Sequence, residues 1–65
     1  MSNKENLFQP GQRIRLLHMT DQYHPVPDGT EGTVAFTDDA GQVHMIWDNG
    51  RTLALLPDVD EFVLI

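Results

Sequence analysis

"QVHMIWDNGRTLALL", residues 42–56, holds two alternating apolar runs on either side of a turn sequence. Asn49 and Gly50 favour a tight hairpin, because both residues tolerate the left-handed backbone that short turns require. A two-residue turn would leave the apolar side chains of the two runs on different faces. A three-residue turn with Gly50 as a bulge instead pairs Val43 with Leu55 and gathers the apolar side chains on one face. The buried face decides the register, so the sequence predicts the three-residue turn.

Three further strands are predicted outside this hairpin: 13–18 from its alternation of charged and apolar residues, 29–37 from its β-branched residues, and 61–65 as a short closing strand. The five predicted strands are 13–18, 29–37, 42–47, 51–56 and 61–65. A long first loop spans 19–28, and Pro57 favours one 3₁₀ turn over 57–60, just before the last strand. No stretch keeps a helical period over two turns. The prediction is an all-β fold, a small five-stranded SH3-like barrel whose closure removes exposed sheet edges.

The same alternation predicts which side chains face the core. Ile14 and Leu16 should point inward from the first strand, and Val34 and Phe36 should share one face of the second. Val43, Met45, Trp47, Leu53 and Leu55 should complete that core. Apolar residues also fall at predicted outward positions, namely Leu17 and Ile46, where they could extend a binding patch.

Composition limits the chain to one small domain. Its 65 residues include no cysteine, which is typical of a reducing compartment and excludes a thiol nucleophile. We expect a flexible N-terminal tail over 1–9, anchored by Leu7 and Phe8, and a barrel domain over 10–65. The chain shows neither a secretory signal nor an apolar run of membrane-spanning length. These features predict a cytoplasmic protein.

The stretch "PDGTEGTV", residues 27–34, raises the question of a phosphate cradle. Phosphate-binding glycine loops precede a helix N-terminus, and no helix is predicted here. Gly29 is therefore expected to end a turn begun by Pro27 and Asp28. Gly32 is expected to let the second strand bend around the barrel.

The charge balance disfavours nucleic acid as a partner. The chain has ten acidic and four basic residues, which gives a net charge of −6. Nucleic acids are polyanions and bind preferentially to basic surfaces. Arg13, Arg15 and Arg51 could still support weak binding to nucleic acid. The acidic residues gather in predicted loops, where they serve solubility or cap turns: Asp38, Asp39, Asp58, Asp60 and Glu61.

Two resemblances add to these inferences. "PGQRIRL" followed by "GTEGTV" resembles KOW-type SH3-like barrels, because Gly29, Gly32 and Val34 match a Gly-x-x-Gly-x-Val strand entry. From about Pro10 to Phe62 the chain also resembles an uncharacterised bacterial family of small domains of unknown function. That family is met in phage, plasmid and other mobile-element settings. The resemblance implies an SH3-like fold and brings no catalytic residues with it.

The sequence departs from both better-known SH3-like classes. Peptide-binding SH3 domains carry several aromatic residues in the first long loop and a tryptophan at the start of the third strand. Here Tyr23 is the only aromatic residue of that loop, and Trp47 ends the third strand. KOW domains that bind nucleic acid tend to have basic loops, whereas the loops of this chain are acidic.

The residues best suited to bind a partner lie in the long loop. Tyr23, His24, Pro25, Val26 and Pro27 form either a proline-stiffened crossover packed on the barrel or an edge that binds a partner. The candidate partner-binding residues are Tyr23, His24, Pro25, Val26, Ile46, Trp47 and Arg51. Trp47 and Arg51 should meet at the rim, where a cation–π contact is possible.

No catalytic or metal-binding constellation is recognisable. His18, His24 and His44 match no compact metal-ligand spacing, and neither a paired-carboxylate nor a serine–histidine–aspartate arrangement is evident. We therefore expect no enzymatic activity, no metal and no cofactor.

Three functions remain open on the sequence alone. The first is a non-enzymatic module that binds a protein partner. The second is an acidic inhibitor or decoy, of an anti-defence type, that acts on a nucleic-acid-binding protein of the host. The third is a weak KOW-like nucleic-acid binder. Self-association is a further possibility for so small a domain.

Overall fold

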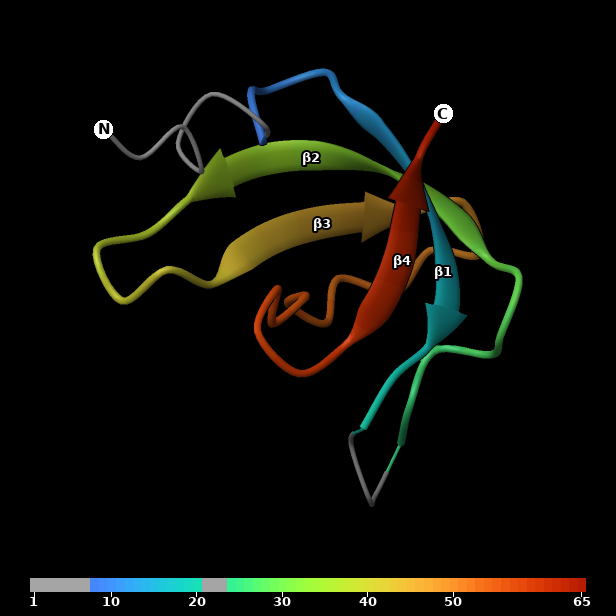
Figure 1. Cartoon of the computed structure of the whole chain (residues 1–65). Coiled ribbons are helices and arrows are strands. Elements are labelled where there is room, and N and C mark those ends of the chain that lie inside the picture. Colours follow the sequence, from blue (N-terminus) through green and yellow to red (C-terminus); the bar gives the residue numbers. More distant parts are fainter. Residues whose placement is uncertain (1–7, 21–23) are drawn as a thin grey trace.

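A four-stranded antiparallel sheet forms the frame of the domain in the computed structural model, which describes residues 8–20 and 24–65 (Figure 1). Its strands are β1 (Arg13–His18), β2 (Glu31–Thr37), β3 (Val43–Trp47) and β4 (Glu61–Leu64), in the sheet order β3-β2-β1-β4. Within the described ranges there is no helix. The all-β prediction is confirmed, and four of the five predicted strands are present within two residues of their predicted bounds.

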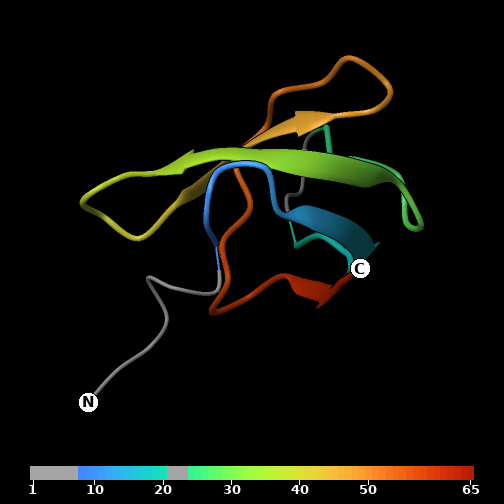
Figure 2. The same ribbon diagram turned by 90° about the horizontal axis from the view of Figure 1, so that it is seen from above.

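The sheet is strongly curled, with β2 as the strand shared by both halves. β2 pairs with β1 near its start and with β3 along most of its length. Bulges interrupt the register between Val34 and Phe36 on β2 and between Leu16 and His18 on β1. Bulges bend strands and increase their twist. Seen from above, the β1–β4 pair therefore lies apart from β2 and β3, and the chain from β3 to β4 crosses between them (Figure 2).

The hairpin after β3 has the predicted register but not the predicted strand. Val43 pairs with Leu55, and Gly50 has a φ of 90° in the turn, as the three-residue turn requires. However, residues 51–56 add to this bridge only one further backbone hydrogen bond with β3, from the Trp47 N–H to the Arg51 carbonyl, so the fifth strand was predicted wrongly. The cause is the indole N–H of Trp47, which donates to the Leu53 carbonyl at 2.8 Å. A continuous antiparallel ladder would offer that carbonyl to the backbone N–H of Met45.

The predicted 3₁₀ turn and the predicted barrel closure are also wrong. The backbone N–H groups of both Val59 and Asp60 donate to the Leu56 carbonyl, at 3.1 and 2.8 Å, so the turn at 57–60 lacks the successive i→i+3 bonds of a 3₁₀ helix. The sheet remains unclosed, because β4 pairs only with β1 and β3 lies three places away in the sheet order. An edge therefore remains along β4.

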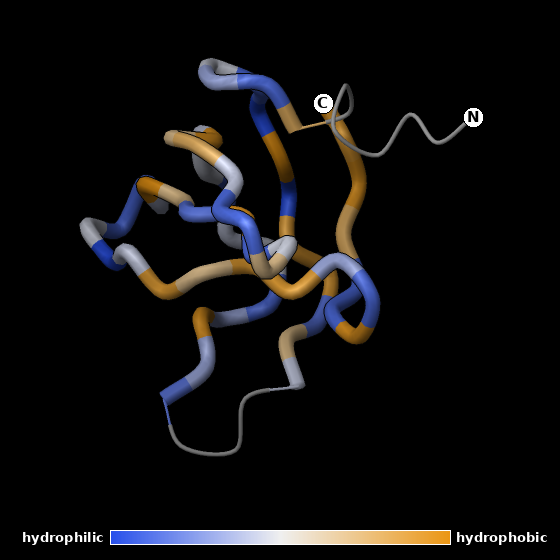
Figure 3. Tube along the Cα trace, turned by 90° about the vertical axis from the view of Figure 1, so that its left-hand side faces the viewer, coloured by the Kyte–Doolittle hydropathy of each residue, from blue (hydrophilic) through white to orange (hydrophobic). Residues whose placement is uncertain are grey.

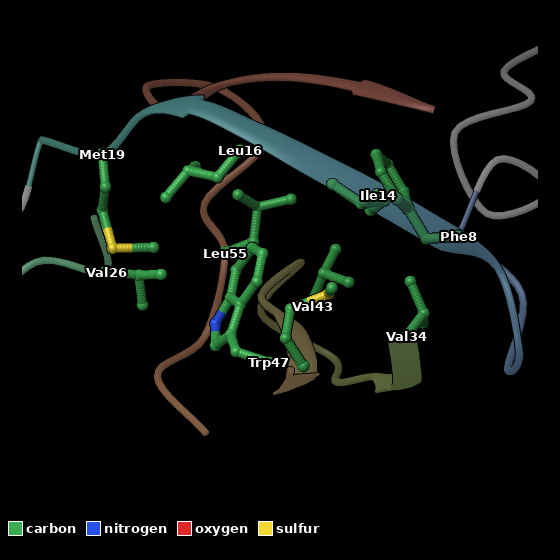
Figure 4. Packing of buried hydrophobic residues seen from close by; sticks show 10 residues of the cluster. Phe8, Ile14, Leu16, Met19, Val26, Val34, Val43, Trp47 and Leu55 are labelled. Carbon is green, nitrogen blue, oxygen red and sulfur yellow. The ribbon is translucent and has the colours of Figure 1, made fainter. Parts of the chain in front are cut away.

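The core lies on the concave side of this curled sheet. Its buried members are Phe8, Ile14, Leu16, Met19, Val26, Val34, Val43, Met45, Trp47 and Leu55. The Trp47 ring lies close to Leu55 and Val43, with Val26 nearby (Figure 4). Phe8 is 6% exposed and its ring lies 5.5 Å from that of Phe62, so it packs the segment before β1 against β4. Leu7, the other predicted anchor, lies outside the described residues.

Phe36 is the exception among the predicted core residues. Its side chain is 52% exposed, whereas that of Val34 is 2% exposed. Strict alternation would place both on one face. The bulge between them inserts an extra residue and turns Phe36 to the opposite face of the sheet.

Gly32 is required by the close approach of Trp47 rather than by a bend. A Cβ atom at this position would lie 2.7 Å from Cε3 of the indole and 3.0 Å from the backbone Cα of the same residue. Gly29 has a different reason: its φ is 87°, in the turn from Pro27 to Thr30 that precedes β2. The predicted turn at Gly29 is confirmed, and the predicted role of Gly32 changes.

Gly32→Ala should destabilise the domain by about 1–3 kcal/mol, because the added methyl overpacks the site against a fully buried indole. Urea unfolding followed by tryptophan fluorescence measures the effect. Gly29→Asn is the matched control, since a Cβ there meets open space and asparagine tolerates a positive φ. An unchanged unfolding midpoint for Gly32→Ala would contradict the packing described here.

Candidate interaction surface

Two of the predicted partner-binding side chains are buried in the core. Val26 and Trp47 are each 1% exposed, so neither is available to a partner. This corrects the prediction, because the described parts of the first loop contribute Met19 and Val26 to the core. Tyr23 lies outside the described residues.

His24 and Pro25 lie at the surface of this loop, and the half-buried Arg51 lies beside it. The Arg51 guanidinium donates a hydrogen bond to the backbone carbonyl of His24, and this bond ties the first loop to the hairpin after β3. Pro25 and His24 are exposed. The predicted cation–π contact is not seen among the described residues, where the Trp47 indole is a core side chain and the Arg51 guanidinium bonds to the loop backbone. Arg51 therefore holds the loop in place.

The convex face of the sheet, here called the outer face, carries a network of ion pairs. Arg13 donates to both carboxylate oxygens of Asp48, at 2.8 and 2.7 Å, and to the hydroxyl of Thr33 at 3.0 Å. Glu31 accepts from Arg15 at 2.9 and 3.0 Å and from Arg13 at 3.4 Å. The hydrogen bonds from Arg13, followed by its charge, lower the pKa of Asp48 despite some desolvation. Both guanidinium groups of β1 are thus already matched by carboxylates.

The same face carries an apolar patch that the sequence only half revealed. Ile46 is 57% exposed, as its outward position predicted. Phe36 joins it from β2 and stacks on the His44 ring, with centroids 4.3 Å apart and an angle of 7° between the planes. His44 Nε2 lies 2.9 Å from Asp38 Oδ2, which fixes the imidazole under the phenyl ring. The pKa of Asp38 is lowered first by this bond and then by the backbone N–H of Gln42.

Two of the aspartates predicted to lie in solubilising or capping positions hold backbone groups in place. Asp60 is 6% exposed, and its carboxylate accepts from the backbone N–H and hydroxyl of Thr20 at 3.0 and 2.9 Å and from the N–H of Leu56 at 2.9 Å. Asp38 caps its own turn by accepting from Ala40 and Gln42. These two carboxylates therefore hold backbone in place, and the sequence missed the burial of Asp60.

A shallow pocket adjoins the buried Asp60. It has a volume of about 370 Å³ and is lined by Met19, Thr20, Gln42, Leu53, Ala54, Leu56 and Asp60. The Asp60 oxygens are already satisfied by Thr20 and Leu56. In the part of the chain that the structure describes, no three histidine or acidic side chains gather closely enough to hold a metal ion. The pocket thus offers an apolar wall and little free polar chemistry.

These features define a small all-β domain with a charged and apolar outer face. The chain belongs to a domain family of unknown function, DUF4314, whose family model matches residues 3–65. The match confirms the predicted membership of a family of unknown function, and it begins within the segment predicted as a tail. Searches among curated proteins and among solved structures gave no match. No helix in the described residues is long and apolar enough to cross a membrane.

Asp60→Ala should destabilise the domain by about 1–3 kcal/mol, because the backbone N–H groups of Thr20 and Leu56 lose their acceptor. Thermal or urea unfolding measures the loss. Asp39→Ala removes the same charge from an exposed turn position and should change stability by less than about 0.5 kcal/mol. Equal effects of the two variants would show that Asp60 does not hold this turn.

Asp48→Asn should lower stability at neutral pH, and the difference from the parent should vanish in acid. A lowered pKa stabilises the folded state above the usual carboxyl value of 3.8, and this contribution is lost as the pH falls through the lowered value. Urea midpoints between pH 7 and pH 2 measure the difference, with Asp39→Asn as the control for net charge. A difference that persists at the acid limit would contradict the ion-pair assignment.

Proposed function

We propose that the chain is a non-enzymatic interaction module of SH3-like type that binds a protein partner through the outer face of β2 and β3. The observation that carries the proposal is the pair of large apolar side chains on that face, Ile46 and Phe36, which are 57% and 52% exposed. Exposed apolar groups inside a polar surround are typical of protein-binding surfaces. Here the surround is the network of Arg13, Asp48 and Glu31.

Two features support the outer face over the predicted loop. The Phe36 ring is held by its stack on His44, so little side-chain freedom is lost when a partner covers it. The loop has already placed Val26 in the core and given the His24 carbonyl to Arg51. His24 and Pro25 can flank a partner, while Ile46 lies at the centre of the proposed surface.

The SH3-like type is supported by the order of the elements. A long connection follows β1, a hairpin joins β2 to β3, and a further segment runs beside β3 before β4 returns to β1. The absence of cysteine supports a cytoplasmic location as part of the same proposal. The resemblance to domains of phage and other mobile elements supports a partner from the host cell.

The alternative functions have less support from the described residues. Nucleic-acid binding would need the guanidinium groups of Arg13 and Arg15, which are matched by Asp48 and Glu31. An acidic decoy is supported by the net charge of −6 and by the exposed carboxylates of Asp39, Asp58 and Glu61, but Asp60 is buried and Asp38 caps a turn.

Affinity capture from host extract after brief crosslinking tests the proposal. Ile46→Asp should reduce recovery of the specific partner by about tenfold or more, since truncated or charged anchors at an interface centre cost the most. Val59→Asp is the matched control, because Val59 is also 52% exposed but lies in the turn before β4. Unfolding midpoints check that both variants are folded. Recovery of the same proteins by the parent and by Ile46→Asp would refute this surface.

A further inference from the structure

The free edge of β4 is the strongest surface that the proposed function leaves unused. Ile65 donates its backbone N–H to the Arg13 carbonyl at 3.1 Å, and Arg15 pairs with Val63. Because hydrogen-bonding direction alternates along an antiparallel strand, Val63 and Ile65 direct their backbone groups toward β1. Phe62 and Leu64 therefore direct theirs away from the sheet. Among the described residues, no backbone partner reaches these groups.

Beyond Glu61 this short edge carries no charged side chain and no proline. Edge strands are commonly protected by lysine, proline or a bulge. The four residues 62–65 instead read Phe-Val-Leu-Ile, and Val63, Leu64 and Ile65 are 38%, 42% and 48% exposed. Figure 3 shows the contrast: β1 alternates between hydrophilic and hydrophobic colours, whereas the segment that ends at the C-terminus is hydrophobic along its length.

We propose that β4 pairs antiparallel with β4 of a second copy of this chain, about a two-fold axis at Val63. In this register Phe62 of each copy exchanges two hydrogen bonds with Leu64 of the other. A two-fold pairing about Val63 thus uses all the outward-directed backbone groups of residues 62 and 64 in both copies.

The arrangement of charge along β4 favours this register. Glu61 carries the only charged side chain of the strand, and the two-fold axis sets this side chain opposite the apolar side chain of Ile65 of the second copy. At the axis two valine side chains meet on the outer face, and β-branched pairs are favourable there.

Sedimentation velocity over a concentration series, with hydrogen exchange at each concentration, tests the proposal. The parent should form a dimer, and the Phe62 and Leu64 amides should gain protection as the dimer forms. The Val63 amide, which already faces β1, should change little. The strand is short and the interface small, so the dimer should be weak. A chain that stays monomeric at millimolar concentration would overturn the proposal.

Two substitutions locate the interface. Val63→Glu should weaken the dimer by about tenfold or more, because like charges would meet at the axis. In the monomer the new carboxylate lies opposite Arg15, so the fold is preserved. Leu64→Pro removes an N–H that faces away from β1 and should also give a folded monomer. Ile46→Glu makes the same charge change on β3 and should leave the dimer intact while it weakens capture of the partner. A dimer unaffected by Val63→Glu and Leu64→Pro would overturn the proposal.

A mixing experiment tests the register itself. Val63→Glu and Val63→Lys should each be monomeric, and a mixture should form a heterodimer because opposite charges then meet at the axis. Native mass spectrometry distinguishes the heterodimer from either homodimer. Loss of dimer in both variants without recovery in the mixture would exclude the Val63 axis.

Discussion

The contact between Trp47 and Gly32 is the constraint on which the rest of the structure depends. The indole occupies the space that any side chain at residue 32 would fill, and it is 1% exposed. The largest side chain of the core therefore lies directly against the backbone of β2. From that position its N–H reaches the Leu53 carbonyl. One aromatic residue thus sets the spacing of β2 and β3 and also fixes the segment that follows the hairpin.

The buried carboxylate of Asp60 is a second constraint, because it links the first loop to the turn before β4. Asp60 joins Thr20, at the start of the long first loop, to Leu56, at the entrance of the turn before β4. A buried charge is costly unless hydrogen bonds satisfy it, and here three donors do so. Segments 40 residues apart in the sequence are held together by this one side chain. A chain of 65 residues without disulfides needs such bonds, because its core alone is small.

Patterns local to one strand could be predicted from the sequence, and events that depend on another segment could not. Apolar alternation correctly gave the inward positions of Ile14 and Leu16 and the pairing of Val43 with Leu55. The predicted inward position of Phe36 was wrong, because one bulged residue reverses the direction of every later side chain on a strand. The prediction of a fifth strand failed because the Leu53 carbonyl accepts a hydrogen bond from the Trp47 side chain. Trp47 lies outside residues 51–56, so the strand propensity of that segment could not reveal this bond.

The candidate site shows the same division. The exposure of Ile46 follows from its place between two inward residues, so the sequence predicted it. Alternation predicted the inward position of Trp47, but its place at the end of β3 suggested a rim that a partner could reach. The space that buries the indole comes from Gly32 on another strand. In the sequence, nothing distinguishes Asp60 from the neighbouring acidic residues, which are exposed. Proximity of an aspartate to a proline turn and a distant threonine is a signal that only the folded chain provides.

The geometry of the edge connects the two proposed surfaces. A two-fold axis at Val63 stands perpendicular to the sheet, so pairing would continue the strand order through both copies as β3-β2-β1-β4-β4-β1-β2-β3. Such an axis keeps the two outer faces on the same side of the extended sheet. Each copy would then carry its own Ile46 and Phe36, so the pair would offer the proposed surface twice. A partner with repeated sites would be bound twice, and linked binding raises avidity well beyond that of a single weak contact. Small size would then favour assembly, because a minimal domain gains both stability and binding strength from its own second copy.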